Sequence, residues 1–485
     1  MTPRCDLLVI GGGVNGAGIA RDAAGRGLSV TLVERGDLAS ATSSASSKLI
    51  HGGLRYLEQY EFRLVAEALA EREVLLCVAG HLVLPLRFVM PHVPQLRPRW
   101  MIRTGLFLYD HLARRSLLPG SSAVRLDSGP YASGLRPELR RGFLYSDCRV
   151  DDARLVVANA LDARQRGARI LTQTECVSAR RQNGTWHVLL SSGEELVARA
   201  IVNAAGPWVK AVLNARLGQA SEDAVRLVKG SHIVLPRLYE GEHAFILQND
   251  DRRVVFMIPY EDRFTLVGTT DVPEEQDASL STATDAEVEY LCRAVNRYLA
   301  RPASPRDVVW RYWGVRPLYD DGTADPSAIT RDYTLRVDDV DGAAPVLSVF
   351  GGKITTYRSL AEHALAKLAR YFPHAGRSWT AQSALPGSGF PDRASAEREL
   401  LERYPAISPA VLRGLFKRHG TLAGDVIGDG LLGEDFGAGL TEREVRYFME
   451  QEWATSAEDV LWRRTKAGLH LDARQRARVA EVVGR

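Results

Sequence analysis

The sequence predicts an α/β fold: a parallel sheet of the Rossmann type, an inserted antiparallel sheet and an all-helical C-terminal region. Three observations carry this prediction. An apolar run at residues 7–10 leads into three consecutive glycines and then into a helix of small residues. Residues 225–336 contain several strand-like runs, two of which are joined by only three residues, a link that requires antiparallel pairing. Beyond residue 386 the composition shifts to helical segments with charged faces.

The first βαβ unit carries a glycine-rich turn between its strand and its helix. Three of its glycines fit the spacing G-x-G-x-x-G, which permits a tight turn, close approach of a pyrophosphate, and packing of the helix on the strand. A second strand, at residues 30–33, ends in Glu34, where an acid accepts hydrogen bonds from an adenosine ribose. An acid argues against the 2′-phosphate of NADP and leaves FAD and NAD open. The cofactor-binding residues expected here are Gly11, Gly12, Gly13, Asn15, Gly16, Glu34 and Arg35.

Composition bounds the class of protein. The chain has 485 residues, enough for two or three domains, and its 45% apolar and 25% charged content is that of a soluble globular protein. Neither a secretory signal nor an apolar run of about 20 residues is found, so we expect a cytoplasmic location with at most peripheral membrane contact. The five cysteines are scattered, which predicts reduced thiols and no metal site. A net charge of +3 suits anionic substrates and lipids without requiring either.

Residues 37–57 form a loop rich in serine and glycine directly after the ribose-binding acid. Composition alone would predict a linker, but the position indicates that the loop lines a cofactor. An NAD domain usually continues into another βα unit here, whereas a polar, glycine-punctuated loop suits the edge of a flavin. The cofactor-lining residues expected are Thr42, Ser43, Ser46, Ser47, Lys48, Leu49, His51, Gly52 and Gly53.

An amphipathic helix is predicted over residues 58–78, followed by a proline-rich stretch. Within that stretch, residues 97–115 combine arginines with aromatic and aliphatic side chains, among them Trp100, Met101 and Phe107. Two interpretations stay open, a basic interfacial segment that contacts lipid and a core helix with solvated arginines.

Residues 149–206 return to the first domain. We expect a helix at 150–167 and strands at 170–177, 186–190 and 196–202, separated by Asn-Gly and Ser-Gly turns. The last strand runs into Ala-Ala-Gly-Pro-Trp, which brings backbone close to the cofactor, as at the switch point of a doubly wound sheet. The cofactor contacts expected in this region are Val177, Gly206 and Trp208.

The inserted sheet is predicted to contain strands at residues 231–235, 244–248, 254–260, 264–269 and 308–312. Polar residues gather at the ends of these strands, where ligand contacts are favoured: His232, Thr269, Thr270, Asp271, Arg316 and Arg331.

Residues 346–370 repeat the opening pattern of strand, glycine turn and helix. The amides at such a helix start stabilise negative charge, which a reduced flavin develops at N1 and the C2 carbonyl. Cofactor contacts are expected from Gly351, Gly352, Lys353, Ile354 and Thr355, and the helix is predicted to bury Tyr357 and Leu360 with Arg358 opposite. In the C-terminal region, Pro409 is expected to open a helix and Thr441 to begin a capping box with Glu444, and no chemistry is expected there.

Several of these motifs together resemble the bacterial aerobic, FAD-dependent glycerol-3-phosphate dehydrogenases, and the likeness runs nearly end to end: residues 11–20, 41–57, 229–234, 314–318, 329–333 and 350–358. The resemblance implies a D-amino-acid-oxidase-like fold, bound FAD, and oxidation of sn-glycerol 3-phosphate to dihydroxyacetone phosphate by hydride transfer from C2 to flavin N5. It also implies ubiquinone as electron acceptor and peripheral attachment, through anionic lipids, to the cytoplasmic face of the inner membrane. Nucleic acid is not expected as a partner, and a homodimer is one open association state.

By resemblance, the substrate's phosphate and hydroxyls are assigned to Arg55, Tyr56, Thr269, Arg316, Arg331 and Lys353. The residues expected to act in catalysis are His51, His232, Arg316 and Lys353. Two histidines compete for the O2 proton, and His51 is favoured because its loop adjoins the flavin ring.

The domain boundaries expected are 1–80, 149–215 and 337–385 for a discontinuous FAD-binding domain, 81–148 and 216–336 for a substrate-binding cap, and 386–485 for the helical domain. Alternative functions are a glycerol-3-phosphate oxidase using O2, another flavin oxidase of the same fold, and a nucleotide-binding, membrane-associated scaffold without catalysis.

Overall fold

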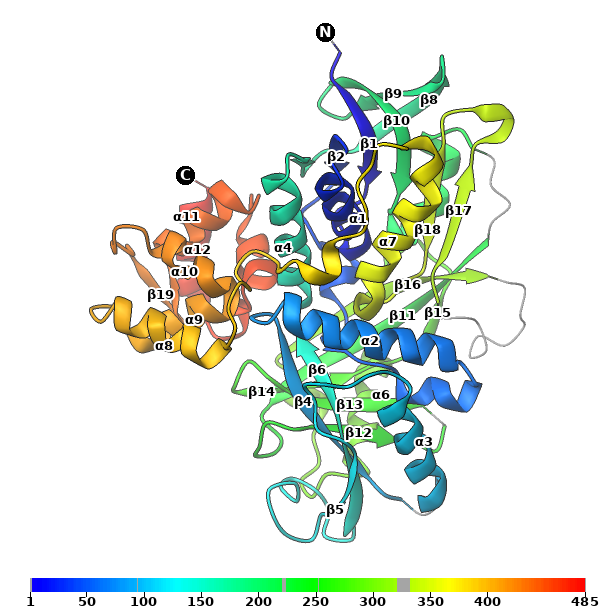
Figure 1. The fold of residues 1–485 in the computed structure, drawn as a ribbon. Coiled ribbons are helices and arrows are strands. Elements are labelled where there is room, and N and C mark those ends of the chain that lie inside the picture. Colours follow the sequence, from blue (N-terminus) through cyan, green and yellow to red (C-terminus); the bar gives the residue numbers. More distant parts are fainter. Residues whose placement is uncertain (1, 94, 220–223, 252, 321–331, 485) are drawn as a thin grey trace.

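The computed structural model of the chain describes residues 2–93, 95–219, 224–251, 253–320 and 332–484 (Figure 1). Two sheets form the body of the molecule, and a mainly helical C-terminal domain lies beside the first of them, next to α4 (Figure 1). This arrangement confirms the predicted α/β class with an inserted sheet. Among the described residues, no helix combines the length and apolarity that a membrane span needs.

The first sheet has a parallel core in the strand order β18-β10-β1-β2-β7, with β17 and the β8–β9 hairpin pairing antiparallel to it. Its strands are β1 (Arg4–Ile10), β2 (Val30–Val33), β7 (Arg169–Leu171), β8 (Cys176–Gln182), β9 (Thr185–Leu190), β10 (Glu195–Asn203), β17 (Thr334–Asp338) and β18 (Val346–Phe350). Side chains alternate across β1. Leu7 and Val9 pack against the helical face, whereas Leu8 and Ile10 pack against the hairpin face.

Three helices cover the helical face of this sheet: α1 (Val14–Gly25), α4 (Asp152–Gln165) and α7 (Tyr357–Leu368). The buried face predicted for residues 357–368 is confirmed. Arg358 is a correction, because it is buried too and pairs with Glu71 and Glu362 instead of facing solvent. A short helix, α5 (Val209–Ala211), follows β10.

The second sheet is almost entirely antiparallel, with β4 and β12 as its parallel pair. Its strands are β3 (Leu49–Ile50), β4 (Val83–Pro91), β5 (Ser122–Arg125), β6 (Arg141–Val150), β11 (Ala224–Pro236), β12 (Ala244–Gln248), β13 (Val254–Tyr260), β14 (Phe264–Gly268), β15 (Val272–Glu274) and β16 (Trp310–Asp320). The antiparallel link predicted between residues 260 and 264 is confirmed, since Tyr260 pairs with Phe264.

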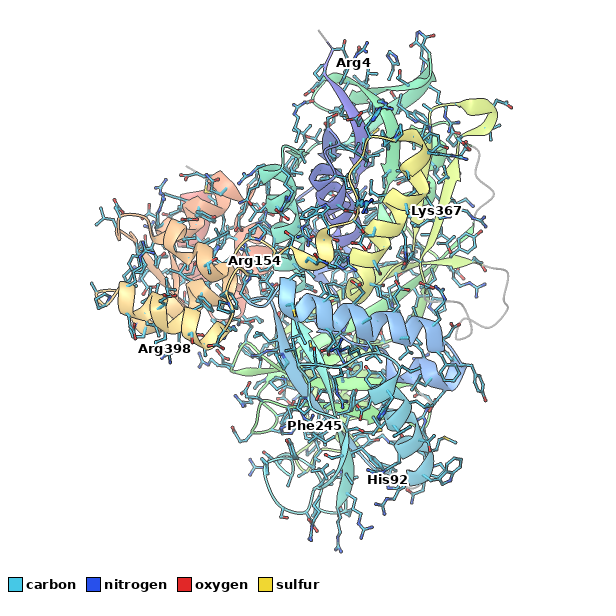
Figure 2. The ribbon with its side chains drawn as sticks, viewed as in Figure 1. Arg4, His92, Arg154, Phe245, Lys367 and Arg398 are labelled. Carbon is cyan, nitrogen blue, oxygen red and sulfur yellow. The ribbon has the colours of Figure 1, made fainter. Side chains whose placement is uncertain are left out.

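Helices cover both faces of the second sheet. α6 (Asp285–Asn296) packs on the face that contains Phe245, labelled in Figure 2, whereas α2 (Phe62–Val78) and α3 (Arg99–His111) pack on the other. α2 also contributes Leu75 and Val78 to the core of the first sheet, so it joins the two cores.

The C-terminal domain contains α8 (Arg393–Arg403), α9 (Pro409–His419), α10 (Ala423–Ile427), α11 (Glu442–Gln451), a π-helix (Asp459–Arg464) and α12 (Ala473–Val483), with a small pair of strands, β19 (Asp435–Gly437) and β20 (Leu440–Thr441). Pro409 opens α9 as predicted. The prediction of a capping box at Thr441 is wrong: the Thr441 hydroxyl makes no cap hydrogen bond, and the Glu444 carboxylate binds Arg418 and His419 instead of the Thr441 amide.

Three predicted strands differ clearly in extent. The strand predicted at 231–235 is the C-terminal part of the longer β11. The run at 170–177 is broken into β7 and β8 by a turn in which Gln173 adopts a positive φ. The strand predicted at 308–312 begins at Trp310 and continues to Asp320, because it pairs with β11 from Ala224 to Val234. This extension carries Arg316 within a strand rather than after one.

Candidate functional site

A cavity of about 840 Å³ is lined by residues of both sheets and of the C-terminal domain. Sequence-predicted residues from four separate segments meet on its wall: Gly11, Gly13, Asn15, Glu34, Arg35, Thr42, Ser43, Ser46, Ser47, Leu49, His51, Tyr56, Gly206, Trp208, His232, Thr269, Arg316, Gly351, Gly352, Lys353, Ile354 and Thr355.

The first glycine turn brings the start of α1 to this cavity. Gly11 has a φ of 112°, and a Cβ atom there would lie 2.5 Å from the carbonyl oxygen of Ala204. A Cβ atom on Gly16 would lie 1.9 Å from the carbonyl oxygen of Gly11, which explains the third glycine of the motif. The first turn of α1 contains no acidic residue, so no carboxylate opposes an anion at its amides.

The second glycine turn meets the first. Gly351 and Gly352 both have positive φ, and the Asn15 side-chain amide donates to the Gly351 carbonyl oxygen at 3.2 Å. After the turn, the chain enters a short 3₁₀-helix (Ile354–Thr356) that continues into α7. Two helix starts separated by more than 300 residues therefore face one cavity.

The far end of the cavity is built around Glu34. Its carboxylate accepts hydrogen bonds from the Gly12 amide at 2.6 Å and the Gly36 amide at 2.9 Å, and these bonds orient it. Arg35 stacks on Trp208, with the guanidinium carbon 4.0 Å from the ring centroid. Thr174, Glu175 and Cys176 complete this wall, whereas Val177, predicted as a cofactor contact, does not lie on it.

The serine-rich loop lines the cavity, but several of its hydroxyls bind protein groups. Ser43 accepts the Val14 amide hydrogen at 2.9 Å, Thr42 donates to the Val315 carbonyl, and Ser46 bonds to Asp152. Lys48 was expected to line the cofactor, but its ammonium is buried away from the cavity wall. There it contacts Asp152 and the Ser44 carbonyl, each at 2.9 Å. Burial lowers the pKa of Lys48, an effect that the Asp152 charge opposes.

Other predicted residues also lie off the cavity wall. Gly12 and Gly16 shape the first turn, and the Gly52 amide donates to the Tyr109 hydroxyl inside the protein. Gly53 and Arg55 are likewise not on the wall. Arg331 lies outside the described residues.

Two cations from different segments face the polar part of the cavity. The Arg316 guanidinium, on β16, contacts Asp271 at 2.5 Å and the Thr270 carbonyl at 3.3 Å. The Lys353 ammonium lies 3.8 Å from the centroid of the Tyr56 ring. Asp271 and Tyr56 therefore hold the two cationic groups in place from the side.

Both candidate histidines are on the wall and both are neutral at physiological pH. Burial lowers the pKa of His51 to about 4, and the charges of Lys353 and Arg72 act in the same direction. Burial lowers the pKa of His232 to about 3, and the charges of Lys48 and Arg316 add to this. His232 contacts the Ser47 hydroxyl at 2.9 Å through Nε2, and its ring stacks on Tyr312. Each imidazole therefore has a nitrogen lone pair available to accept a proton.

Sequence reasoning missed part of the wall. Trp310, Tyr312 and Trp313 line it from β16, and Glu458, Trp462 and Arg463 line it from the C-terminal domain. Alternation along the strand could have indicated Trp310 and Tyr312, which share one face of β16, but not Trp313. No local pattern distinguished the second group from an ordinary charged helix.

Comparisons with known proteins identify the family of the chain. The family model "FAD dependent oxidoreductase" matches residues 6–358, and the model "C-terminal domain of alpha-glycerophosphate oxidase" matches residues 378–485. The chain is 54% identical to a glycerol-3-phosphate dehydrogenase of Pseudomonas aeruginosa, over 99% of this chain and 94% of the relative. It is 52% identical to the aerobic glycerol-3-phosphate dehydrogenase of Escherichia coli, over 98% and 96%.

Two further relatives bear on substrate and cofactor. A D-erythritol 1-phosphate dehydrogenase of Brucella abortus is 50% identical over 98% of this chain and 97% of its own length. The crystal structure of a glycerol-3-phosphate dehydrogenase from Bacillus halodurans complexed with FAD superposes with a TM-score of 0.73, at 26% identity, over 99% of this chain and 94% of that one.

The matches confirm the resemblance inferred from the motifs and decide between the two cofactors that the first glycine turn left open. FAD fits the cavity: the start of α1 lies on its wall with no acidic residue in the first turn, and Gly11 lets the turn pass close to the Ala204 carbonyl, where a side chain would clash. The chain belongs to the FAD-dependent oxidoreductases, as a member of the glycerol-3-phosphate dehydrogenase family.

Proposed function

We propose that the protein oxidises sn-glycerol 3-phosphate to dihydroxyacetone phosphate. The observation that carries the proposal is the meeting of Arg316 and Lys353, from separate segments, with two neutral histidines on the wall of one cavity. A phosphate monoester needs cations, and a secondary alcohol needs a proton acceptor. FAD supplies, when bound, the acceptor for the hydride that leaves C2.

The chain's own residues divide the remaining work. Arg316 presents a planar fork and Lys353 a point charge, and together they hold the phosphate. Thr269, beside Arg316, and Tyr56, beside Lys353, add hydroxyl groups to the same wall. His51 accepts the proton of O2 as hydride departs. Its backbone amide donates to the Thr355 hydroxyl at 3.2 Å, which ties His51 to the start of the second helix.

We further propose that ubiquinone receives the electrons and that the protein attaches peripherally to the cytoplasmic face of the inner membrane. Helix α3 supports the attachment. It buries Ile102, Leu106 and Tyr109 yet leaves Trp100 69% and Phe107 60% exposed. Arg99 and Arg103 are exposed on the same helix. Exposed aromatic side chains beside arginines suit an anionic lipid surface.

The substrate is tested by anaerobic mixing of the FAD-loaded protein with glycerol 3-phosphate, D-erythritol 1-phosphate or glycerol, while the flavin absorbance is followed. Glycerol 3-phosphate should bleach the flavin fastest. Glycerol should be slower by roughly 10²-fold or more, because two charge-assisted contacts to phosphate are lost. Equal rates with glycerol, or no bleaching by glycerol 3-phosphate, would contradict the proposal. Reoxidation by a soluble ubiquinone that outpaces reoxidation by oxygen supports a dehydrogenase, and the opposite order supports an oxidase.

The base is tested with His51→Asn and His232→Asn in the same anaerobic assay. His51→Asn should slow flavin reduction by about 10²- to 10⁴-fold, and His232→Asn should slow it less. Since the pKa of His51 in the protein without substrate is about 4, the wild-type kcat/KM for flavin reduction should hold from neutral pH downward and decline as the pH approaches 4. Near-normal reduction in His51→Asn would transfer the role to His232.

Attachment is tested by sedimentation with vesicles of anionic or zwitterionic lipid. The double variant Trp100→Ser/Phe107→Ser should lose binding to anionic vesicles. The matched control is Leu431→Ser, which removes a side chain that is 76% exposed in the C-terminal domain, and it should bind as the wild type does. Equal binding by the double variant and the control would rule out α3 as the contact.

A further inference from the structure

The C-terminal domain reaches into the wall of the cofactor cavity through one π-helix. Residues Asp459–Arg464 form this element, and short π-helical segments occur frequently at functional sites. Three consecutive side chains point from it toward the body of the molecule. Trp462 stacks on Trp310 of β16 with 4.6 Å between ring centroids, and the next two residues are arginines that both bind Asp37. Trp462 and Arg463 also line the cavity.

The π-helix binds the segment after β2 of the first sheet through Asp37. The Asp37 carboxylate is buried and accepts hydrogen bonds from Arg463 Nε at 2.6 Å and from Arg464 Nη1 and Nη2 at 2.8 and 2.7 Å. Asp37 stands three residues after Glu34, at the start of the serine-rich loop. Two guanidinium groups on one buried carboxylate form a rigid attachment.

The loop beyond Asp37 contacts the first glycine turn directly. The Ala39 amide donates to the Gly12 carbonyl at 3.0 Å, and the Ser43 hydroxyl accepts the Val14 amide hydrogen at the start of α1. Residues 39–47 all line the cavity. A shift at Asp37 would therefore move the groups that surround the phosphates of FAD.

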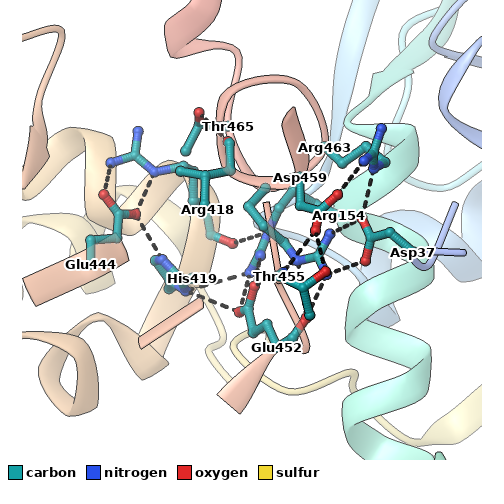
Figure 3. A network of polar contacts seen from close by, with 12 residues as sticks. Asp37, Arg154, Arg418, His419, Glu444, Glu452, Thr455, Asp459, Arg463 and Thr465 are labelled. Atoms are coloured by element: carbon teal, nitrogen blue, oxygen red, sulfur yellow. Dashed lines mark hydrogen bonds and ion pairs between the residues drawn. The ribbon is translucent and has the colours of Figure 1, made fainter. Parts of the chain in front are cut away.

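A buried network anchors the π-helix on its other side (Figure 3). Arg464 is fully buried and also donates to the Glu452 carbonyl, while the Glu452 carboxylate binds Arg154 of α4 at 2.9 Å. Figure 2 labels Arg154 where α4 meets the C-terminal helices. At the far end, His419 lies between Glu452 and Glu444. Each buried charge has an opposite partner, so the network resists rearrangement.

We propose that the C-terminal domain is a clamp on the FAD site and that Asp37, Arg463 and Arg464 are positioning residues for FAD. The clamp holds the loop after Glu34 in the shape that receives the nucleotide half of the cofactor. Its action concerns retention of FAD and is the same whichever polyol phosphate is oxidised.

The clamp is tested by removing FAD from the full-length protein and titrating FAD back, with flavin fluorescence as the readout. Asp37→Asn should raise the Kd for FAD by about tenfold or more, because the residue loses its negative charge and one of the two oxygens that accept hydrogen bonds from Arg463 and Arg464. Substrate identity does not enter the titration, so its result is independent of the proposed reaction.

The matched control is Glu444→Gln, which breaks the far end of the same network, at Arg418 and His419, without contacting Asp37. It should lower Tm while leaving the Kd for FAD within about twofold of wild type. Should Asp37→Asn fail to fold, Arg463→Met decides, because Arg464 still holds Asp37; its Kd should rise severalfold. The clamp would be overturned if Asp37→Asn, or Arg463→Met in its place, bound FAD with the wild-type Kd. It would also be overturned if Glu444→Gln raised the Kd for FAD by as much as that variant does.

Discussion

The hydrogen bond from Asn15 to the Gly351 carbonyl joins the two glycine turns, and the site depends on that junction. A Cβ atom on Gly352 would lie 2.9 Å from Leu360 and 3.0 Å from the Asn15 amide, so the second turn fits against the first only without a side chain. Both helix starts consequently face the same cavity. Their partial positive charges add where an anionic cofactor needs them.

Buried arginines set the relative orientation of the segments around this junction. Arg21 pairs with Asp162 between α1 and α4, Arg72 pairs with Asp147 between α2 and β6, and Arg464 pairs with Asp37 across the domain boundary. Such pairs add little net free energy of folding, because desolvation offsets their attraction. These pairs instead fix geometry. An unpaired buried charge is costly, so arrangements of the segments that would separate a pair are excluded.

Local patterns predicted the parts of the site that are local. The turns at Gly11 and Gly351 can each be recognised from a strand, glycines and a helix that follow one another within some 30 residues. The short link between residues 260 and 264 allows only antiparallel pairing of the strands it joins. Ion pairs between side chains that are far apart in the sequence could not be predicted from local patterns. The sequence around Lys48 predicts a cofactor contact, but the Lys48 ammonium instead pairs with Asp152, which lies 104 residues away in the chain. The helical pattern predicts Arg358 on the surface, but the Arg358 side chain is buried in an ion pair with Glu71.

The contribution of the C-terminal domain was hidden for the same reason. Trp462 and Arg463 sit in a segment whose sequence is that of a charged helix, and only their contacts with Trp310 and Asp37 reveal a role. The boundaries predicted for the three domains stay a prediction. The second sheet nevertheless recruits β3 from the loop that lines the cofactor cavity, so loop and cap are physically continuous.

The central claim is that both glycine turns serve one flavin whose substrate is held by Arg316 and Lys353. A crystal structure of the protein with FAD and dihydroxyacetone phosphate measures this most directly. We expect the isoalloxazine ring against residues 351–355 and the product phosphate within about 3 Å of both the Arg316 and Lys353 side chains. A phosphate bound away from Arg316 and Lys353, or a ring lying elsewhere in the cavity, would contradict it.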